Sequence, residues 1–165
     1  MLTVVMVLAM CIPVMADDAN YTITIKGNNK VAKSYEAYQV FKGVLSTDGK
    51  LTEIEWGKNI NEAGKTALLE FGGVTYKSAA ELAAALNETN VKDFANEVSK
   101  YLTGTAYKNT DNAISIPKTE AGYYFIKNED RTATVGQAYT KFVLQVVGDT
   151  SFTPKTDAPE IEKKN

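Results

Sequence analysis

The feature that most constrains the fold is the spacing of apolar residues, which changes along the chain. Residues 20–26 (NYTITIK) alternate, with Tyr21, Ile23 and Ile25 on one face and polar or charged side chains on the other. A period of two residues is typical of a β-strand that buries one face. The same kind of pattern predicts further strands at residues 35–45, 51–56, 113–117, 122–127 and 138–147.

The middle of the chain has helical spacing instead. Apolar residues recur at intervals of about 3.6 in three segments, residues 63–71, 79–86 and 91–102. Gly72-Gly73 ends the first, Ser78 and Glu81 form a capping box before the second, and Asn90 stands at the start of the third. Strands on both sides of these helices predict a mainly β fold with an inserted helical segment at about residues 63–102, α+β overall.

Composition excludes several classes of function. The chain has 165 residues and a net charge of −2, and its basic residues are not clustered, so we expect no nucleic-acid partner. It contains no histidine, which rules out Ser-His and Cys-His catalysis and histidine-ligated metals. No glycine-rich phosphate loop is present, and no pair of carboxylates is singled out as in a hydrolase. We therefore predict a protein that is not an enzyme and needs no metal or cofactor.

The N-terminal segment predicts export. Residues 1–16 (MLTVVMVLAMCIPVMA) are almost wholly apolar and end in small or aliphatic residues, as a signal peptide does, so the mature chain would begin near Asp17. The alternative is a buried N-terminal strand or helix. Cys11, the only cysteine, lies in this segment, so the mature chain would have no disulfide. Export without disulfides indicates a bacterium, and a Gram-positive one in particular.

Among the aromatic residues, Trp56 is the candidate ligand contact, because it lies beside Gly57 at the end of a predicted strand. An exposed aromatic ring there could stack on a sugar or on a host protein. The alternative is that the strand alternation already explains Trp56 and the tyrosines as core or half-buried residues.

The C-terminal end predicts an extended arm. Gly148-Asp149 ends the strand over residues 138–147, and Pro154 has no backbone donor and favours extended geometry in the residue before it. Lys155 would then leave the globule on poorly paired backbone, where another protein can reach its amine. We predict a domain over residues 17–150, followed at 151–165 by a linker and the first strand of a second domain.

Three stretches carry a resemblance to a known family: residues 35–43 (YEAYQVFKG), residues 121–126 (AGYYFI) and residues 139–164. With these in this order, the chain resembles the N-terminal domain of Gram-positive pilin (fimbrial) subunits that sortases assemble. The resemblance implies an immunoglobulin-like β-sandwich of the collagen-adhesin B type, often with helical insertions. It also implies a secreted protein attached to the cell wall as part of a pilus.

The resemblance also implies an acceptor residue for assembly. In that family the lysine of a Tyr-Pro-Lys motif attacks a thioester that a pilin sortase forms with another subunit, which gives an intermolecular isopeptide bond. The matching tripeptide is Thr153-Pro154-Lys155, with Thr in place of the usual Tyr, and Val146 where an upstream Trp is often found. Lys163 and Lys164 are the second choice as acceptors.

Family domains often carry an internal Lys–Asn isopeptide bond beside a buried acid. The usual acid position holds Ile116 here, Glu120 is too close to Gly122 to match, and the strand after Lys141 has no Asn or Asp. We therefore predict no internal crosslink in residues 17–155.

The leading hypothesis is a structural pilin subunit that a pilin sortase joins to other subunits through the linker lysine. The alternative is a surface adhesin module that binds a carbohydrate or a host protein near Trp56 and the helical insertion.

Overall fold

The structure is a computed structural model that describes residues 19–26, 34–128 and 141–154. The strands within these residues are β1 (Asn20–Ile25), β2 (Tyr35–Leu45), β3 (Leu51–Trp56), β4 (Tyr107–Lys108), β5 (Ala113–Pro117), β6 (Gly122–Asn128), β7 (Lys141–Val146) and β8 (Thr150–Phe152). The helices are α1 (Glu62–Ala67), α2 (Ala79–Ala85) and α3 (Val91–Val98), with 3₁₀ helices η1 (Leu68–Gly73) and η2 (Lys118–Glu120).

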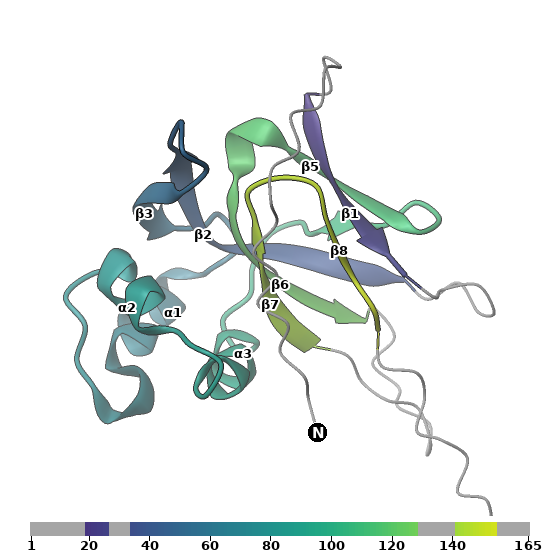
Figure 1. Cartoon of the computed structure of the whole chain (residues 1–165). Coiled ribbons are helices and arrows are strands. Elements are labelled where there is room, and N and C mark those ends of the chain that lie inside the picture. The colour runs from purple at the N-terminus through teal and green to yellow at the C-terminus, as the bar shows by residue number, and fades with distance from the viewer. Residues whose placement is uncertain (1–18, 27–33, 129–140, 155–165) are drawn as a thin grey trace, which may run out of the picture.

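The strands form two sheets (Figure 1). The smaller sheet has the order β5-β1-β8, in which β1 is antiparallel to β5 and parallel to β8. The larger sheet has the order β3-β2-β6-β7, and β4 also pairs with β2. The fold is therefore a mainly β, two-sheet sandwich with a helical insertion, as predicted, and it is compatible with an immunoglobulin-like arrangement.

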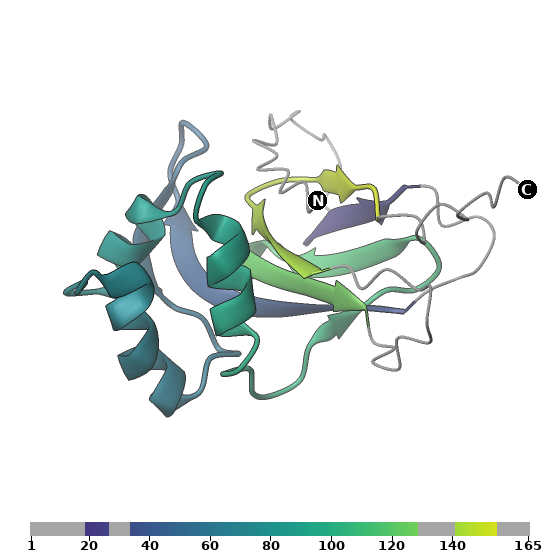
Figure 2. The same ribbon diagram turned by 90° about the horizontal axis from the view of Figure 1, so that it is seen from below.

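Strand alternation divides the apolar residues between two cores. The first core fills the space between the sheets and contains Ile23, Ile25, Tyr124 and Ile126, among other residues. The second lies on the outer face of the larger sheet, where α1, α2 and α3 pack against it. Figure 2 shows these helices gathered at one end of the larger sheet, beside the sandwich. The larger sheet is thus buried on both faces over much of its area, which explains the nearly continuous burial along β6.

Side-chain caps begin the first two helices. The Asn61 side chain accepts a hydrogen bond from the Gly64 N–H at 2.8 Å, which starts α1. Ser78 accepts from the Glu81 N–H at 3.2 Å, as the predicted capping box requires. The Glu81 carboxylate accepts a hydrogen bond from the N–H of Lys77, one residue before the cap, at 2.8 Å.

The third helix begins at Val91 as predicted, but its cap and its end differ from the prediction. Asn90 precedes α3, but its side chain binds Asn87 N–H and Ala85 O instead of capping α3. The third helix ends at Val98, whereas residues 91–102 were expected to be helical. The reason is that Leu102 forms a β-bridge with Ile60, and this bridge draws the chain out of the helix.

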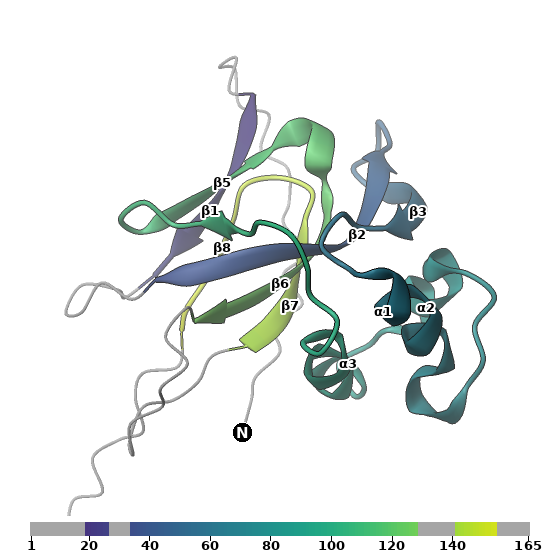
Figure 3. The same cartoon turned by 180° about the vertical axis from the view of Figure 1, so that it is seen from behind.

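That bridge closes the base of the helical insertion. Asn61 N–H donates to Tyr101 O at 3.0 Å, and Thr103 N–H donates to Asn59 O at 2.9 Å. The chain therefore leaves the sheets and returns to them through one short pair of antiparallel segments, and the three α-helices lie together on one side of the sheets (Figure 3). We call the paired segments 58–61 and 101–105 the stem of the insertion.

Among the described residues, none of the helices has the length and apolar character needed to cross a membrane.

Candidate functional site: the C-terminal arm and the polar cluster at the stem

The last strand, β8, extends the packed fold two residues beyond the predicted boundary at residue 150. It pairs in parallel with β1, with Ile25 opposite Phe152. At its start, Thr22 N–H donates to the side chain of Asp149 at 2.9 Å, and at its end Lys26 N–H donates to Phe152 O at 2.9 Å. The extended arm therefore begins at Thr153.

Phe152 is the last residue with a buried side chain before the arm, with 6% of its surface exposed. Its ring meets Tyr35 edge to face at a centroid distance of 5.4 Å, and Phe142 at 5.0 Å. Because Tyr35 is on β2 and Phe142 is on β7, this one ring joins the smaller sheet to the larger one.

The predicted pilin-motif residues continue from this point. Thr153 is exposed and Pro154 is partly buried. Lys155 lies outside the described residues, as do Lys163 and Lys164 and the predicted signal peptide at residues 1–16. What the structure supplies for this site is its attachment point, which is the end of β8.

Trp56, the predicted ligand contact, is half-buried at the end of β3. Its ring stacks on Phe41 at a centroid distance of 5.3 Å with an interplanar angle of 26°. One face of the ring therefore belongs to the core beneath the helices, and a ligand could reach only the rest of the side chain.

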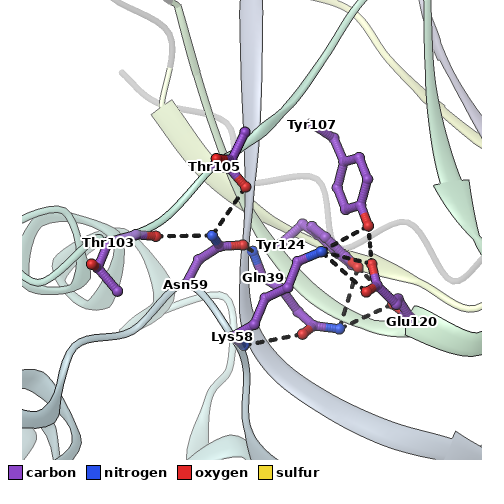
Figure 4. A network of polar contacts seen from close by, with 8 residues as sticks. All are labelled: Gln39, Lys58, Asn59, Thr103, Thr105, Tyr107, Glu120 and Tyr124. Carbon is purple, nitrogen blue, oxygen red and sulfur yellow. Dashed lines mark hydrogen bonds and ion pairs between the residues drawn. The ribbon is translucent and has the colours of Figure 1, made fainter.

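A polar cluster lies beside the stem (Figure 4). The Lys58 ammonium is 2.9 Å from a Glu120 carboxylate oxygen and 2.7 Å from the hydroxyl of Tyr107. Tyr107 in turn donates its hydroxyl hydrogen to Glu120. Lys58 also lies over the Tyr107 ring, 4.3 Å from its centroid. The cluster thus joins three segments of the chain: the start of the insertion and η2 supply the ion pair, and β4 supplies the tyrosine that binds both of its members.

The cluster changes the pKa of each member. Partial burial disfavours the charged form of Glu120, but the hydrogen bonds from Tyr107 and Lys58 outweigh it and lower the pKa of the carboxyl group. Partial burial likewise disfavours the Lys58 ammonium, but its bonds to Tyr107 and Glu120 raise its pKa above the ordinary value. Lys58 is therefore held protonated, which makes it a poor nucleophile and a good structural cation.

Neutral hydrogen bonds connect this cluster to β2. Tyr124 donates its hydroxyl hydrogen to the backbone carbonyl of Glu120 at 2.6 Å, and the Gln39 amide donates to the same carbonyl at 3.2 Å. The Gln39 side chain also accepts from Lys58 N–H at 3.2 Å. Burial raises the pKa of Tyr124, so its hydroxyl stays a neutral donor.

Asn59 ties the stem itself to β2. Its side-chain oxygen accepts from Gln39 N–H at 2.8 Å. Its amide nitrogen donates to Thr103 O at 2.9 Å and to Thr105 O at 3.2 Å. With 1% of its surface exposed, Asn59 replaces the strand pairing that β2 lacks between β3 and β4. Sequence reasoning missed both Lys58 and Asn59, because their partners are 19 to 62 residues away along the chain.

A separate charge, which is buried, lies on β6. Lys127 is 3% exposed, its ammonium is 3.8 Å from a Glu36 oxygen, and it lies 5.2 Å from the centroid of the Tyr38 ring. The Tyr38 hydroxyl donates to the other Glu36 oxygen at 2.7 Å. The charge pair is on the outer face of the larger sheet, not between the sheets. The prediction of no internal crosslink stays a prediction.

The described residues also contain a pocket of about 360 Å³ between η1 and α3. Leu68 and Phe71 supply apolar wall, and Glu70, Asp93 and Glu97 supply carboxylates. Glu97 is already paired with Lys100 at 2.8 Å. In the part of the chain that the structure describes, no group of three or more His, Cys, Asp or Glu side chains is arranged to hold a metal ion.

No protein-family model matches the chain, and no curated protein is significantly similar to it.

Proposed function

We propose that this chain is the N-terminal domain of a structural pilin subunit, and that a pilin sortase joins it to other subunits through Lys155. One observation carries the proposal: β8 ends at Phe152, which is locked between the sheets, and Thr153-Pro154-Lys155 follows directly. The family-like tripeptide therefore starts at a rigid point on a β-sandwich. Export across the membrane and attachment to the cell wall are part of the same proposal.

In this reaction the chain supplies only the attacking amine. The Lys155 ε-amine attacks the carbonyl carbon of a thioester that a sortase cysteine holds with another subunit. An amide C–N bond forms, the C–S bond breaks, the cysteine leaves as a thiolate, and the amine proton passes to a base on the sortase. A free lysine with a pKa of about 10.4 is neutral in only about one molecule in a few thousand at pH 7, so the sortase must supply deprotonation.

The site geometry supports an acceptor on the arm more than one on the globule. Lys58 is held protonated in its cluster, and Lys127 is buried beside Glu36. Lys42, Lys65 and Lys100 each lie within 3.4 Å of a carboxylate. Each of these three amines is therefore already engaged with a carboxylate, although at exposed positions such an ion pair is weak.

The test is sortase-catalysed transfer of a fluorescent LPxTG peptide onto the chain. Wild type should gain one peptide, and mass mapping should place it on Lys155. Lys155→Ala should lose the transfer, whereas Lys92→Ala, which removes an exposed lysine on α3, should retain it. If Lys155→Ala is still labelled, Lys155 is not the acceptor, and Lys163 and Lys164 become the next residues to replace.

A further inference from the structure

The pocket between η1 and α3 lies where the backbone bends sharply. The chain leaves helical geometry at Phe71 and continues through Gly72, whose φ of +68° is readily adopted by glycine. Nothing lies within 4 Å of the position that a Cβ atom on Gly72 would occupy. The pocket has a volume of about 360 Å³. Ligand pockets have volumes of about 300–1,000 Å³, so this one is at the small end of the range and suits a single side chain.

The wall of the pocket is apolar and its rim is acidic. Leu68 and Phe71 are buried and supply the apolar wall. Glu70 on η1 and Asp93 on α3 are exposed, and Glu97 on α3 is partly exposed. Among the described residues that line the pocket, none is a lysine or an arginine. A carboxylate is negatively charged at neutral pH, so the pocket offers an occupant an apolar surface below a negative rim.

The three carboxylates differ in how far they are already engaged. Glu97 is paired with Lys100 at 2.8 Å, and Glu70 accepts a hydrogen bond from the Thr75 hydroxyl at 2.8 Å. Within the described residues, the Asp93 carboxylate has neither a hydrogen bond nor an ion pair. The carboxylates are also not arranged to hold a metal ion. A cation that pairs with more than one of them must therefore reach them separately.

A guanidinium group meets these requirements. It carries five N–H donors in a planar fork, it stays charged, and it is more weakly hydrated than an ammonium. The methylene groups of an arginine side chain also pack readily on apolar surface while the charged end stays at the rim. The donors can bind carboxylates on both η1 and α3, and the methylene groups can lie against Leu68 and Phe71.

An exposed apolar side chain lies beside this rim. Val74 is 50% exposed. The next residue, Thr75, bonds to Glu70, which keeps Val74 close to the acidic side of the pocket. A free guanidinium compound fills the pocket without covering Val74, whereas a polypeptide that inserts an arginine can bury both surfaces. The apolar side chain therefore favours a protein as the source of the cation.

We propose that the pocket between η1 and α3 binds an arginine side chain of a partner protein, and that a neighbouring apolar residue of the partner covers Val74. The guanidinium group pairs with Asp93 and Glu70. This role is independent of the acceptor role of Lys155, and it gives the helical insertion a recognition surface of its own.

The test is titration of the isotope-labelled whole chain with three probes, followed by NMR of the backbone amides. The peptide acetyl-Gly-Leu-Arg-Leu-Gly-amide carries the proposed group, the same peptide with citrulline in place of arginine has no charge there, and propylguanidinium is the side chain alone. The arginine peptide should give saturable shifts at the amides of Phe71, Gly72 and Asp93. Propylguanidinium should bind at the same amides more weakly, and the citrulline peptide should not bind at the same concentrations.

Five variants assign the binding to this pocket, each checked for folding by circular dichroism. Asp93→Asn should weaken binding of the arginine peptide about twofold to fivefold, as expected for an exposed ion pair, whereas Glu88→Gln, an exposed acid that does not line the pocket, should leave it unchanged. Ala67→Leu enlarges a side chain that lines the pocket and should block binding with every carboxylate in place. Val74→Thr should weaken binding of the peptide but not of propylguanidinium, and Val44→Thr, which changes an exposed valine of the β2–β3 hairpin, should affect neither.

Three results would overturn the proposal. If the arginine peptide gives no saturable shifts, or the citrulline peptide gives the same ones, the pocket does not bind a cation. If binding is unchanged in both Asp93→Asn and Ala67→Leu, the cation binds elsewhere. If propylguanidinium binds as tightly as the peptide and Val74→Thr has no effect, the pocket takes a free cation and the partner protein is wrong. None of these results bears on Lys155, which peptide transfer tests separately.

Discussion

Asn59 is the residue at which a single substitution should most weaken the attachment of the insertion to the sandwich. Its side chain makes three hydrogen bonds, one to Gln39 N–H and two to the carbonyls of Thr103 and Thr105. Asn59→Ala removes all three and leaves buried backbone groups without these partners. The stem would then be held mainly by the Ile60–Leu102 bridge and by the backbone bonds next to it.

The expected loss is about 3 kcal/mol, since a typical hydrogen bond contributes about 1 kcal/mol net and a buried group left unsatisfied costs at least as much. A domain of this kind has a free energy of unfolding of about 5–15 kcal/mol. The loss is therefore a large fraction of the total. For an m-value of about 1.5 kcal/mol/M, the urea midpoint should fall by about 2 M.

Urea unfolding followed by Trp56 fluorescence measures this directly, because Trp56 is the only tryptophan and stacks in the core beneath the helices. Asn112→Ala is the matched control: Asn112 is exposed, and its loss should change stability by less than about 0.5 kcal/mol. At pH 7, Asn59→Asp should lower the free energy of unfolding at least as much as Asn59→Ala, because a carboxylate would face two carbonyl oxygens. Protonation of this carboxylate at low pH should relieve the repulsion.

If Asn59→Ala lowers the free energy of unfolding by less than about 1 kcal/mol, this reasoning is refuted. It would mean that water or backbone movement satisfies the stem as well as the asparagine does.

Three further predictions concern the rest of the fold. The pKa of the Glu120 carboxyl group is lower in the folded protein than its ordinary value of 4.5, so its ion pair should stabilise the protein above pH 4.5 and lose that effect as the pH falls through the folded value. When the free energy of unfolding is measured at decreasing pH, Glu120→Gln should show a weaker pH dependence than the exposed control Glu88→Gln. Gly122→Ala should destabilise by more than about 3 kcal/mol or prevent folding, since its Cβ would collide with the backbone oxygen of Phe41; a soluble variant with the wild-type thermal midpoint would contradict this. The intact mass of the folded chain over residues 17–155 should match its sequence, and a loss of one ammonia, about 17 Da for an amine–amide condensation, would show an internal crosslink.

The local pattern of the sequence was sufficient for most strands and for the start of two helices. Alternation at residues 20–26 depends only on which neighbours are apolar, and the structure buries Ile23 and Ile25 as that pattern requires. The capping signal at Ser78 is equally local, because the bond it predicts spans three residues. Each of these features depends on residues that lie within a few positions of one another in the sequence.

Pairing between distant segments was not readable in the same way. The domain was expected to end at residue 150, yet Thr150–Phe152 forms a strand because β1 offers an edge for pairing and Phe152 packs its ring against Tyr35 and Phe142. The third helix was expected to reach residue 102, yet it stops at Val98 because Leu102 pairs with Ile60. Each outcome depends on a partner segment far away in the sequence, which the local pattern cannot identify.

The polar cluster and the stem show the same division most clearly. Lys58, Asn59 and Glu120 look like ordinary surface residues in sequence, and only the folded sheets bring them to Gln39 and Tyr107. By itself the sequence determined the β-rich class, the helical insertion and the tripeptide that suggests an acceptor lysine. Tertiary structure decided where the arm is anchored and how the insertion is closed, because both depend on contacts between side chains that only folding brings within hydrogen-bonding or packing distance.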